Sequence, residues 1–133
     1  MWTSLRPALV MSERDDAIRV ENPAWPGTPD VSWCIDGVEG WLELKQINHW
    51  PKRIDDILVV SHFTPQQRMW LTRRHNAGGR THLLIKVDVE WILLRGFVAA
   101  AILGRANRDT LIRRSLLACS PLNVPEFRRI LVS

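Results

Sequence analysis

The stretch that most constrains the fold runs from Gly27 to Lys45 and reads GTPDVSWCIDGVEGWLELK. Two short runs of strand-forming residues flank Asp36-Gly37, and Asp-Gly between such runs is the strongest short-range signal for a hairpin. With these two residues as the turn, counting outward along both strands brings Asp30 opposite Glu43. The sequence therefore predicts an antiparallel hairpin with two carboxylates at its open end.

Side chains alternate across a strand, so the predicted hairpin has two different faces. One face is apolar and is expected to pack on the core: Val31, Trp33, Ile35, Val38, Leu42 and Leu44, with Gly40 facing Trp33. The other face carries Asp30, Ser32, Cys34, Glu39, Trp41, Glu43 and Lys45. Two carboxylates and an amine converge on this second face, which is the candidate site.

Asp30, Glu43 and Lys45 together suit metal-assisted phosphodiester hydrolysis. Adjacent carboxylates repel each other, and a hard divalent cation between them makes the arrangement favourable. Mg²⁺ takes one or two protein carboxylates, keeps several waters and accepts phosphate oxygens, while Lys45 could orient an attacking water or stabilise phosphate charge. The alternative is a solvated, charged hairpin face. Pro-Asp at the start of one strand and Glu-x-Lys at the end of the next favour the catalytic interpretation.

These residues also resemble a known family. Gly27-Thr28-Pro29-Asp30 followed by Glu43-Leu44-Lys45 is similar to the motif of the PD-(D/E)XK nuclease superfamily, in particular its Holliday-junction-resolvase-like and VRR-NUC branches. The resemblance covers about Glu13 to Val87. It implies that Asp30 and Glu43 bind Mg²⁺, that the Leu44 carbonyl is a further ligand, and that Lys45 acts on the attacking water. Mn²⁺ is expected to substitute for Mg²⁺.

Members of this family usually carry one more acidic residue upstream of the Asp. Glu21 and Glu13 both qualify by position, and Glu21, followed by Asn22 shortly before Gly-x-Pro-Asp, is the preferred candidate for the metal site. The alternative is an exposed carboxylate that pairs with Arg19 or Arg14.

A helix is predicted downstream of the hairpin. Thr64-Pro65-Gln66-Gln67 has Thr at the N-cap, Pro at the first helical position and Gln at the third, which together make a capping box. The helix should run to about Asn76, before Ala77-Gly78-Gly79. Thr-Pro-x-Gln also resembles the VRR-NUC pattern, so Gln67 has two compatible interpretations, as a cap partner and as a catalytic-site residue.

The order of predicted elements indicates an α/β fold. Thr81 to Val87 is mostly apolar, as a strand covered on both faces would be, and a strand–helix–strand order places it beside the Glu-x-Lys strand. The predicted fold is a small mixed β-sheet flanked by helices, of the restriction-endonuclease-like kind, with a mainly helical basic extension. We expect a single nuclease domain over 1–133, with its core at 1–88 and the extension at 89–133.

The remaining predictions concern the two ends of the chain and one loop. A short helix is expected within Ser4–Asp16 with Pro7 in its first turn, followed by a brief strand at Ile18–Val20. Trp50, Lys52 and Arg53 of a loop at Gln46–Arg53 could line the approach of a substrate. The alternative for this loop, at least equally favoured, is a plain surface loop with a packed Trp50. In the last third we expect an edge strand at Glu90–Leu94 and helices at Phe97–Leu103, Asp109–Ala118 and Val124–Val132.

Composition narrows the functional classes. The chain has 133 residues, 46% hydrophobic and 24% charged, with a net charge of +4 and only three lysines among 18 basic residues. Arginine suits bidentate phosphate contacts, although a solvated basic face is an equal alternative. Two distant cysteines and four histidines without zinc-type spacing indicate an intracellular protein without a zinc site. No signal peptide or membrane-spanning stretch is expected, so the location is cytoplasmic.

The function predicted from the sequence is that of a Mg²⁺-dependent DNA endonuclease, with branched DNA as the substrate that the resolvase-like resemblance implies. A homodimer would supply two sites for symmetric cuts. The alternative from a different class is a DNA-binding or assembly protein that retains the nuclease fold without cleavage. Glu21-Asn22 shortly before Gly-x-Pro-Asp resembles the phage-type members of the family, and this resemblance implies a phage-encoded protein that would act in the host cytoplasm.

Overall fold

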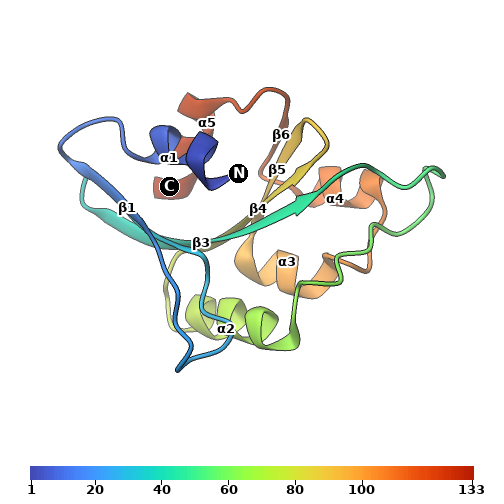
Figure 1. The fold of residues 1–133 in the computed structure, drawn as a ribbon, viewed down its shortest axis with the longest axis horizontal. Helices are drawn as coiled ribbons and strands as arrows, with labels where there is room; N and C mark the ends of the chain where they lie inside the picture. Colours follow the sequence, from blue (N-terminus) through green and yellow to red (C-terminus); the bar gives the residue numbers. More distant parts are fainter.

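The computed structural model describes residues 1–133 and shows one six-stranded sheet between two layers of helices (Figure 1). The strands are β1 (Asp15–Arg19), β2 (Val31–Ile35), β3 (Val38–Ile47), β4 (Thr81–Val87), β5 (Glu90–Arg95) and β6 (Leu117–Cys119). The helices are α1 (Trp2–Leu9), α2 (Pro65–Asn76), α3 (Gly96–Ile102), α4 (Arg108–Arg114) and α5 (Val124–Val132). The predicted fold class, a mixed sheet flanked by helices, is confirmed.

The strands lie in the sheet in the order in which they occur in the chain. All neighbouring strands are antiparallel except β3 and β4, which are parallel and are joined by the segment that contains α2. A parallel pair needs such a crossover, and a helix that packs back on the sheet is its usual form. The crossover therefore brings α2 over the polar face of the hairpin.

The predicted hairpin forms with the predicted register. Ile35 pairs with Val38, and Val31 pairs with Leu42. Asp36 and Gly37 both have positive φ, 48° and 85°, as a type I′ turn requires. The close approach of Gly40 to Trp33 is also present, since a Cβ at Gly40 would lie 2.3 Å from the indole.

Alternation along the strands separates two cores. Beneath α1 and α5, one core contains the predicted apolar face of the hairpin, including Trp33 and Leu42, together with Phe127 of α5. Beneath α2 and α3, the second core contains Leu83 and Ile85 of β4. Glu43 and Lys45 pair with these two β4 residues and therefore face α2. Figure 1 shows the two helical layers on opposite faces of the sheet.

Several predicted boundaries are wrong. The N-terminal helix spans Trp2–Leu9 rather than 4–16, because the chain from Asp15 onward pairs with β2. Pro7 lies beyond the first turn of this helix instead of within it. In the last third, the strand that begins at Glu90 is not at the sheet edge, because Leu117–Cys119 pair with it as β6 instead of completing the predicted 109–118 helix. Residues 89–133 thus contribute two strands to the sheet. The helices predicted at 97–103 and 124–132 are present.

No helix of this chain is both long and apolar enough to cross a membrane.

Candidate active site

Asp30 and Glu43 lie together at the open end of the hairpin. The β2–β3 ladder ends at Val31 and Leu42, so the next pair outward is Asp30 and Glu43, as predicted. Glu43 is 1% exposed, whereas Asp30 is only half-buried. Burial, followed by repulsion from the Asp30 carboxylate, raises the pKa of Glu43 to about 8 against the opposing effect of Lys45. The site therefore holds two carboxylates at a position that disfavours both being charged.

Asp30 is fixed by main-chain N–H groups from the two segments on either side of it. Its Oδ2 accepts a hydrogen bond from the Leu44 N–H at 2.9 Å, and its own carbonyl accepts one from the Val20 N–H at 2.8 Å. Continued outward, the register places Pro29 opposite Leu44. Proline has no N–H to donate, and the N–H and C=O of one strand residue point to the same side. The Leu44 carbonyl therefore points toward Asp30 without a ladder donor opposite it.

The Glu43 carboxylate is only partly satisfied. Its Oε1 lies 3.2 Å from the Lys45 Nζ, and its Oε2 is buried without any hydrogen-bond partner. A buried acceptor without a partner costs free energy, so its presence calls for a functional or chemical explanation.

Lys45 is buried, at 4% exposed, and its amine has partners on three sides. Its Nζ donates to the His62 carbonyl and to Gln67 Oε1, each at 3.0 Å, and contacts the Glu43 carboxylate. The aromatic ring of Phe63 lies 5.5 Å from the same nitrogen. Each of the three N–H donors of the ammonium group thus has an acceptor.

Gln67 connects this amine to the start of α2. Its Oε1 accepts from the Thr64 N–H at 3.0 Å as well as from Lys45, while the Thr64 hydroxyl accepts from the Gln67 N–H. The predicted capping box is therefore present. The predicted cap contact of Gln67 is present, and the same side chain also contacts Lys45, while a catalytic role for Gln67 stays a prediction.

The donor set fits a hard divalent cation. The chain has no group of three His, Cys, Asp or Glu side chains that could hold a metal ion, so the available donors are two carboxylates and one main-chain carbonyl. Mg²⁺ is commonly bound by one or two carboxylates with waters completing its shell. A cation would give the orphaned Glu43 Oε2 a partner and would offset the repulsion from Asp30.

The structure does not bring Glu21 or Glu13 to this pair. Both are exposed, and neither joins Asp30 and Glu43 in a metal-holding group. Val20 is the residue that pairs with Asp30, so the neighbouring Glu21 is one position out of register and alternation turns it to the other face. The third acidic ligand expected from the family pattern is therefore absent from this arrangement.

Trp50 is held outside the site. Its indole N–H donates to Glu90 Oε1 at 3.1 Å, and the Arg108 guanidinium lies 4.8 Å from its ring centre. Lys52 and Arg53 are exposed on the same loop. The packed arrangement favours the surface-loop alternative for Trp50.

Two contacts that shape the site, one made by His62 and one by Gly27, were not predicted from the sequence. His62 supplies the carbonyl that holds Lys45, and its imidazole has a lowered pKa because of burial and the nearby Lys45 charge, with Asp30 acting in the opposite direction. Gly27, at φ +91°, packs on the start of α2, where a Cβ would lie 2.4 Å from the Gln66 carbonyl oxygen. In the sequence, His62 lies shortly before the Thr64 cap and Gly27 shortly before Pro29-Asp30. These positions were the signals that could have placed both residues near the site.

The fold and site define an α/β protein with a carboxylate–carboxylate–amine cluster, and comparisons with known proteins add little beyond this. No protein-family model matches the sequence, and no curated protein matches it. Among solved structures, the chain is similar to Hjc, a Holliday junction resolvase from the archaeal hyperthermophile Archaeoglobus fulgidus, with 18% identity, a TM-score of 0.43 and 71% of each chain covered. A likeness this distant does not assign an activity to the chain.

Proposed function

We propose that the chain is a divalent-metal-dependent DNA endonuclease that hydrolyses phosphodiester bonds, and that residues 1–133 act as a single nuclease domain. One observation carries the proposal: Asp30, Glu43 and Lys45 converge on one face of the hairpin, with a free carboxylate oxygen on Glu43. The resemblance of Gly-x-Pro-Asp and Glu-x-Lys to the PD-(D/E)XK motif supports the same function.

Asp30 and Glu43 would hold Mg²⁺ or Mn²⁺, with the Leu44 carbonyl as a further ligand. When bound, the ion would neutralise charge that develops on the phosphate during hydrolysis. Gln67 and the His62 carbonyl hold two N–H groups of Lys45, and the third faces Glu43 at the longest of the three distances, 3.2 Å. If the N–H group of Lys45 that faces Glu43 turned to a water or a phosphate oxygen instead, Lys45 could hold the attacking water or the phosphate.

Branched DNA is the proposed substrate, and the motif's similarity to the resolvase-like branch supports this choice. The sequence contains no helix-turn-helix or zinc-finger signature, which favours recognition of DNA shape over base sequence. A homodimer is proposed because two symmetric cuts need two sites.

The test is cleavage of labelled four-way junction, flap, linear duplex and single-stranded DNA by the wild-type protein in Mg²⁺ and in EDTA. We expect paired nicks in the junction in Mg²⁺ and no cleavage in EDTA. Equal cleavage of all four substrates would remove the preference for branched DNA. Binding without cleavage in either Mg²⁺ or Mn²⁺ would favour the non-catalytic alternative, a DNA-binding or assembly protein.

A further inference from the structure

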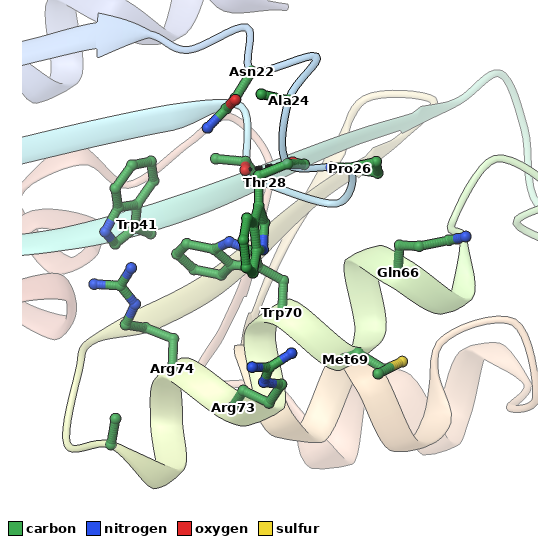
Figure 2. A pocket seen from close by; sticks show the side chains of 12 residues that line it. Asn22, Ala24, Pro26, Thr28, Trp41, Gln66, Met69, Trp70, Arg73 and Arg74 are labelled. Carbon is green, nitrogen blue, oxygen red and sulfur yellow. Dashed lines mark hydrogen bonds between the residues drawn. The ribbon is translucent and has the colours of Figure 1, made fainter.

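A groove of about 820 Å³ lies beside the candidate active site, between α2 and the loop at 22–28. Figure 2 shows its walls: Asn22, Pro26 and Thr28 come from the loop, while Trp70, Arg73 and Arg74 come from one face of the helix. Trp41 of β3 also lines the groove. It lies on the same strand face as Glu43, two residues away, which is about 7 Å along a strand.

Aromatic rings line the groove. Trp41 and Trp70 meet edge to face, with ring centres 5.1 Å apart, and the Arg74 guanidinium lies 5.7 Å and 4.6 Å from their respective centres. Trp25 also lines the groove and is 57% exposed. An indole left this exposed offers a flat apolar face to a ligand.

The loop that carries Trp25 is held in place by its own hydrogen bonds. The Trp25 N–H donates to the Asn22 carbonyl at 3.2 Å, and the Trp25 carbonyl accepts from the Thr28 hydroxyl at 2.8 Å. Gly27 packs directly on the main chain of Gln66. The loop and helix are therefore a preformed pair of walls, which lowers the entropic cost of binding a ligand between them.

The charge of the groove is positive. None of its lining residues is acidic, α2 as a whole contains no Asp or Glu, and Arg73 and Arg74 form no salt bridge. Aromatic faces combined with arginines that have no carboxylate partner suit the binding of unpaired bases and their phosphates, since every base can stack and every nucleotide carries an anion. A paired duplex does not offer its base faces in this way.

We propose that this groove binds a short single-stranded DNA segment by stacking its bases on Trp25 and Trp70 and by pairing its phosphates with Arg73 and Arg74. The inference rests on the proposed nuclease function for its choice of ligand, and it specifies the substrate as DNA with unpaired bases next to the cleaved bond. Such bases occur at flaps, at single-strand gaps and at opened branch points.

The test measures binding of a fluorescently labelled oligodeoxythymidylate and of a blunt duplex by anisotropy, in EDTA so that no cleavage occurs. We expect the single strand to bind more tightly than the duplex and to quench tryptophan fluorescence. Trp25→Ala and Arg73→Gln should each weaken single-strand binding about tenfold, and Trp25→Phe should restore most of it because a ring can still stack. Met11→Ala and Arg114→Gln, at exposed positions outside the groove, are the matched controls and should change nothing.

Unchanged single-strand affinity in Trp25→Ala, with far-ultraviolet circular dichroism like that of the wild type, would overturn the inference. So would an equal loss of affinity for single strand and duplex, or binding of the single strand no tighter than of the duplex. The groove proposal and the nuclease proposal are contradicted by different outcomes. Cleavage that persists without a Trp25-dependent affinity overturns only the groove, whereas Trp25-dependent binding without any cleavage in Mg²⁺ overturns only the nuclease.

Discussion

The carboxylate of Asp30 accepts the main-chain N–H of Leu44 at 2.9 Å, which joins the two halves of the candidate motif by a side chain where the strand ladder has ended. Pro29 explains why the ladder ends there, because it lies opposite Leu44 and has no N–H. One oxygen of Asp30 thus fixes its position. The Asp30 carboxyl also adjoins the Glu43 carboxyl, and both its charge and its hydrogen bond with Glu43 raise the pKa of Glu43.

This tether predicts different outcomes for two substitutions of Asp30. Asp30→Asn keeps an oxygen that can accept the Leu44 N–H and removes the repulsion from Glu43, so the free energy of unfolding should be at least that of the wild type. Asp30→Ala removes the acceptor and should cost about 1–2 kcal/mol. Urea denaturation of both variants in EDTA measures the difference. Equal stability of the two variants would show that the tether does not contribute.

Replacing Glu43 should exchange activity for stability. The pKa of Glu43 is about 8 in the folded protein, whereas its ordinary value is 4.5. The free energy of unfolding therefore falls as the pH rises from 4.5 to about 8. Glu43→Gln does not titrate. In EDTA at pH 8 the variant should therefore be more stable than the wild type, on the order of 4 kcal/mol.

The same comparison at a pH of about 3, well below 4.5, serves as the control, because Glu43 is then protonated in both the folded and unfolded states and the advantage should vanish. Thermal unfolding across this pH range gives the measurement. A Glu43→Gln advantage that does not change with pH would contradict the assigned cause, and a variant that still cleaves DNA would remove Glu43 from the site.

Gln67 is predicted to position Lys45 in addition to capping α2. Gln67→Ala removes an acceptor from Lys45 and breaks the capping box, whereas Thr64→Ala breaks the capping box alone. Both should lose about 1 kcal/mol of stability. Only Gln67→Ala should also lower the cleavage rate, by about 10- to 100-fold, as expected for a partner that supports a catalytic group. Single-turnover cleavage at a temperature where both variants are folded decides the matter, and an equal loss in both would leave Gln67 with a structural role only.

Gly27 is predicted to be required for close packing between the Pro-Asp segment and α2. A Cβ at Gly27 would lie 2.4 Å from the Gln66 carbonyl oxygen, while one at Gly78 would meet nothing within 4 Å. Both glycines have positive φ, 91° and 93°, so their alanine variants share the same backbone strain. Gly27→Ala should be less stable than Gly78→Ala by about 1–3 kcal/mol. Chemical denaturation of the pair checks this, and similar values would show that the loop can move away without cost.

Much of the hairpin and of the α2 crossover was predictable because their signals are local. Asp36-Gly37 fixes the turn, the turn fixes the register, and the register brings Asp30 opposite Glu43. The Thr64 cap, Pro65 and Gln67 likewise determine where α2 begins. In these segments turn chemistry, capping and alternation all favour the same structure.

Where the sequence predictions are wrong, distant parts of the chain determine the structure. Leu117–Cys119 continues an amphipathic pattern but pairs with Trp91–Leu93, a choice that only the assembled sheet makes favourable. Asp15 enters a strand because β2 is available and because the Arg128 guanidinium, from the far end of the chain, binds its carboxylate at 2.9 Å. The role of the His62 carbonyl could not be read from its side chain, since a main-chain atom makes the contact.

The most direct test of the proposed site compares the wild type with Asp30→Asn and Lys45→Ala in single-turnover cleavage of a labelled four-way junction in Mg²⁺, with junction binding measured in parallel in EDTA. The account predicts that both variants bind the junction as the wild type does and that cleavage falls by more than the roughly 100-fold expected for loss of a supporting group. Undiminished cleavage by Asp30→Asn would contradict the central claim, because a carboxylate that holds the metal ion cannot be replaced by an amide without loss.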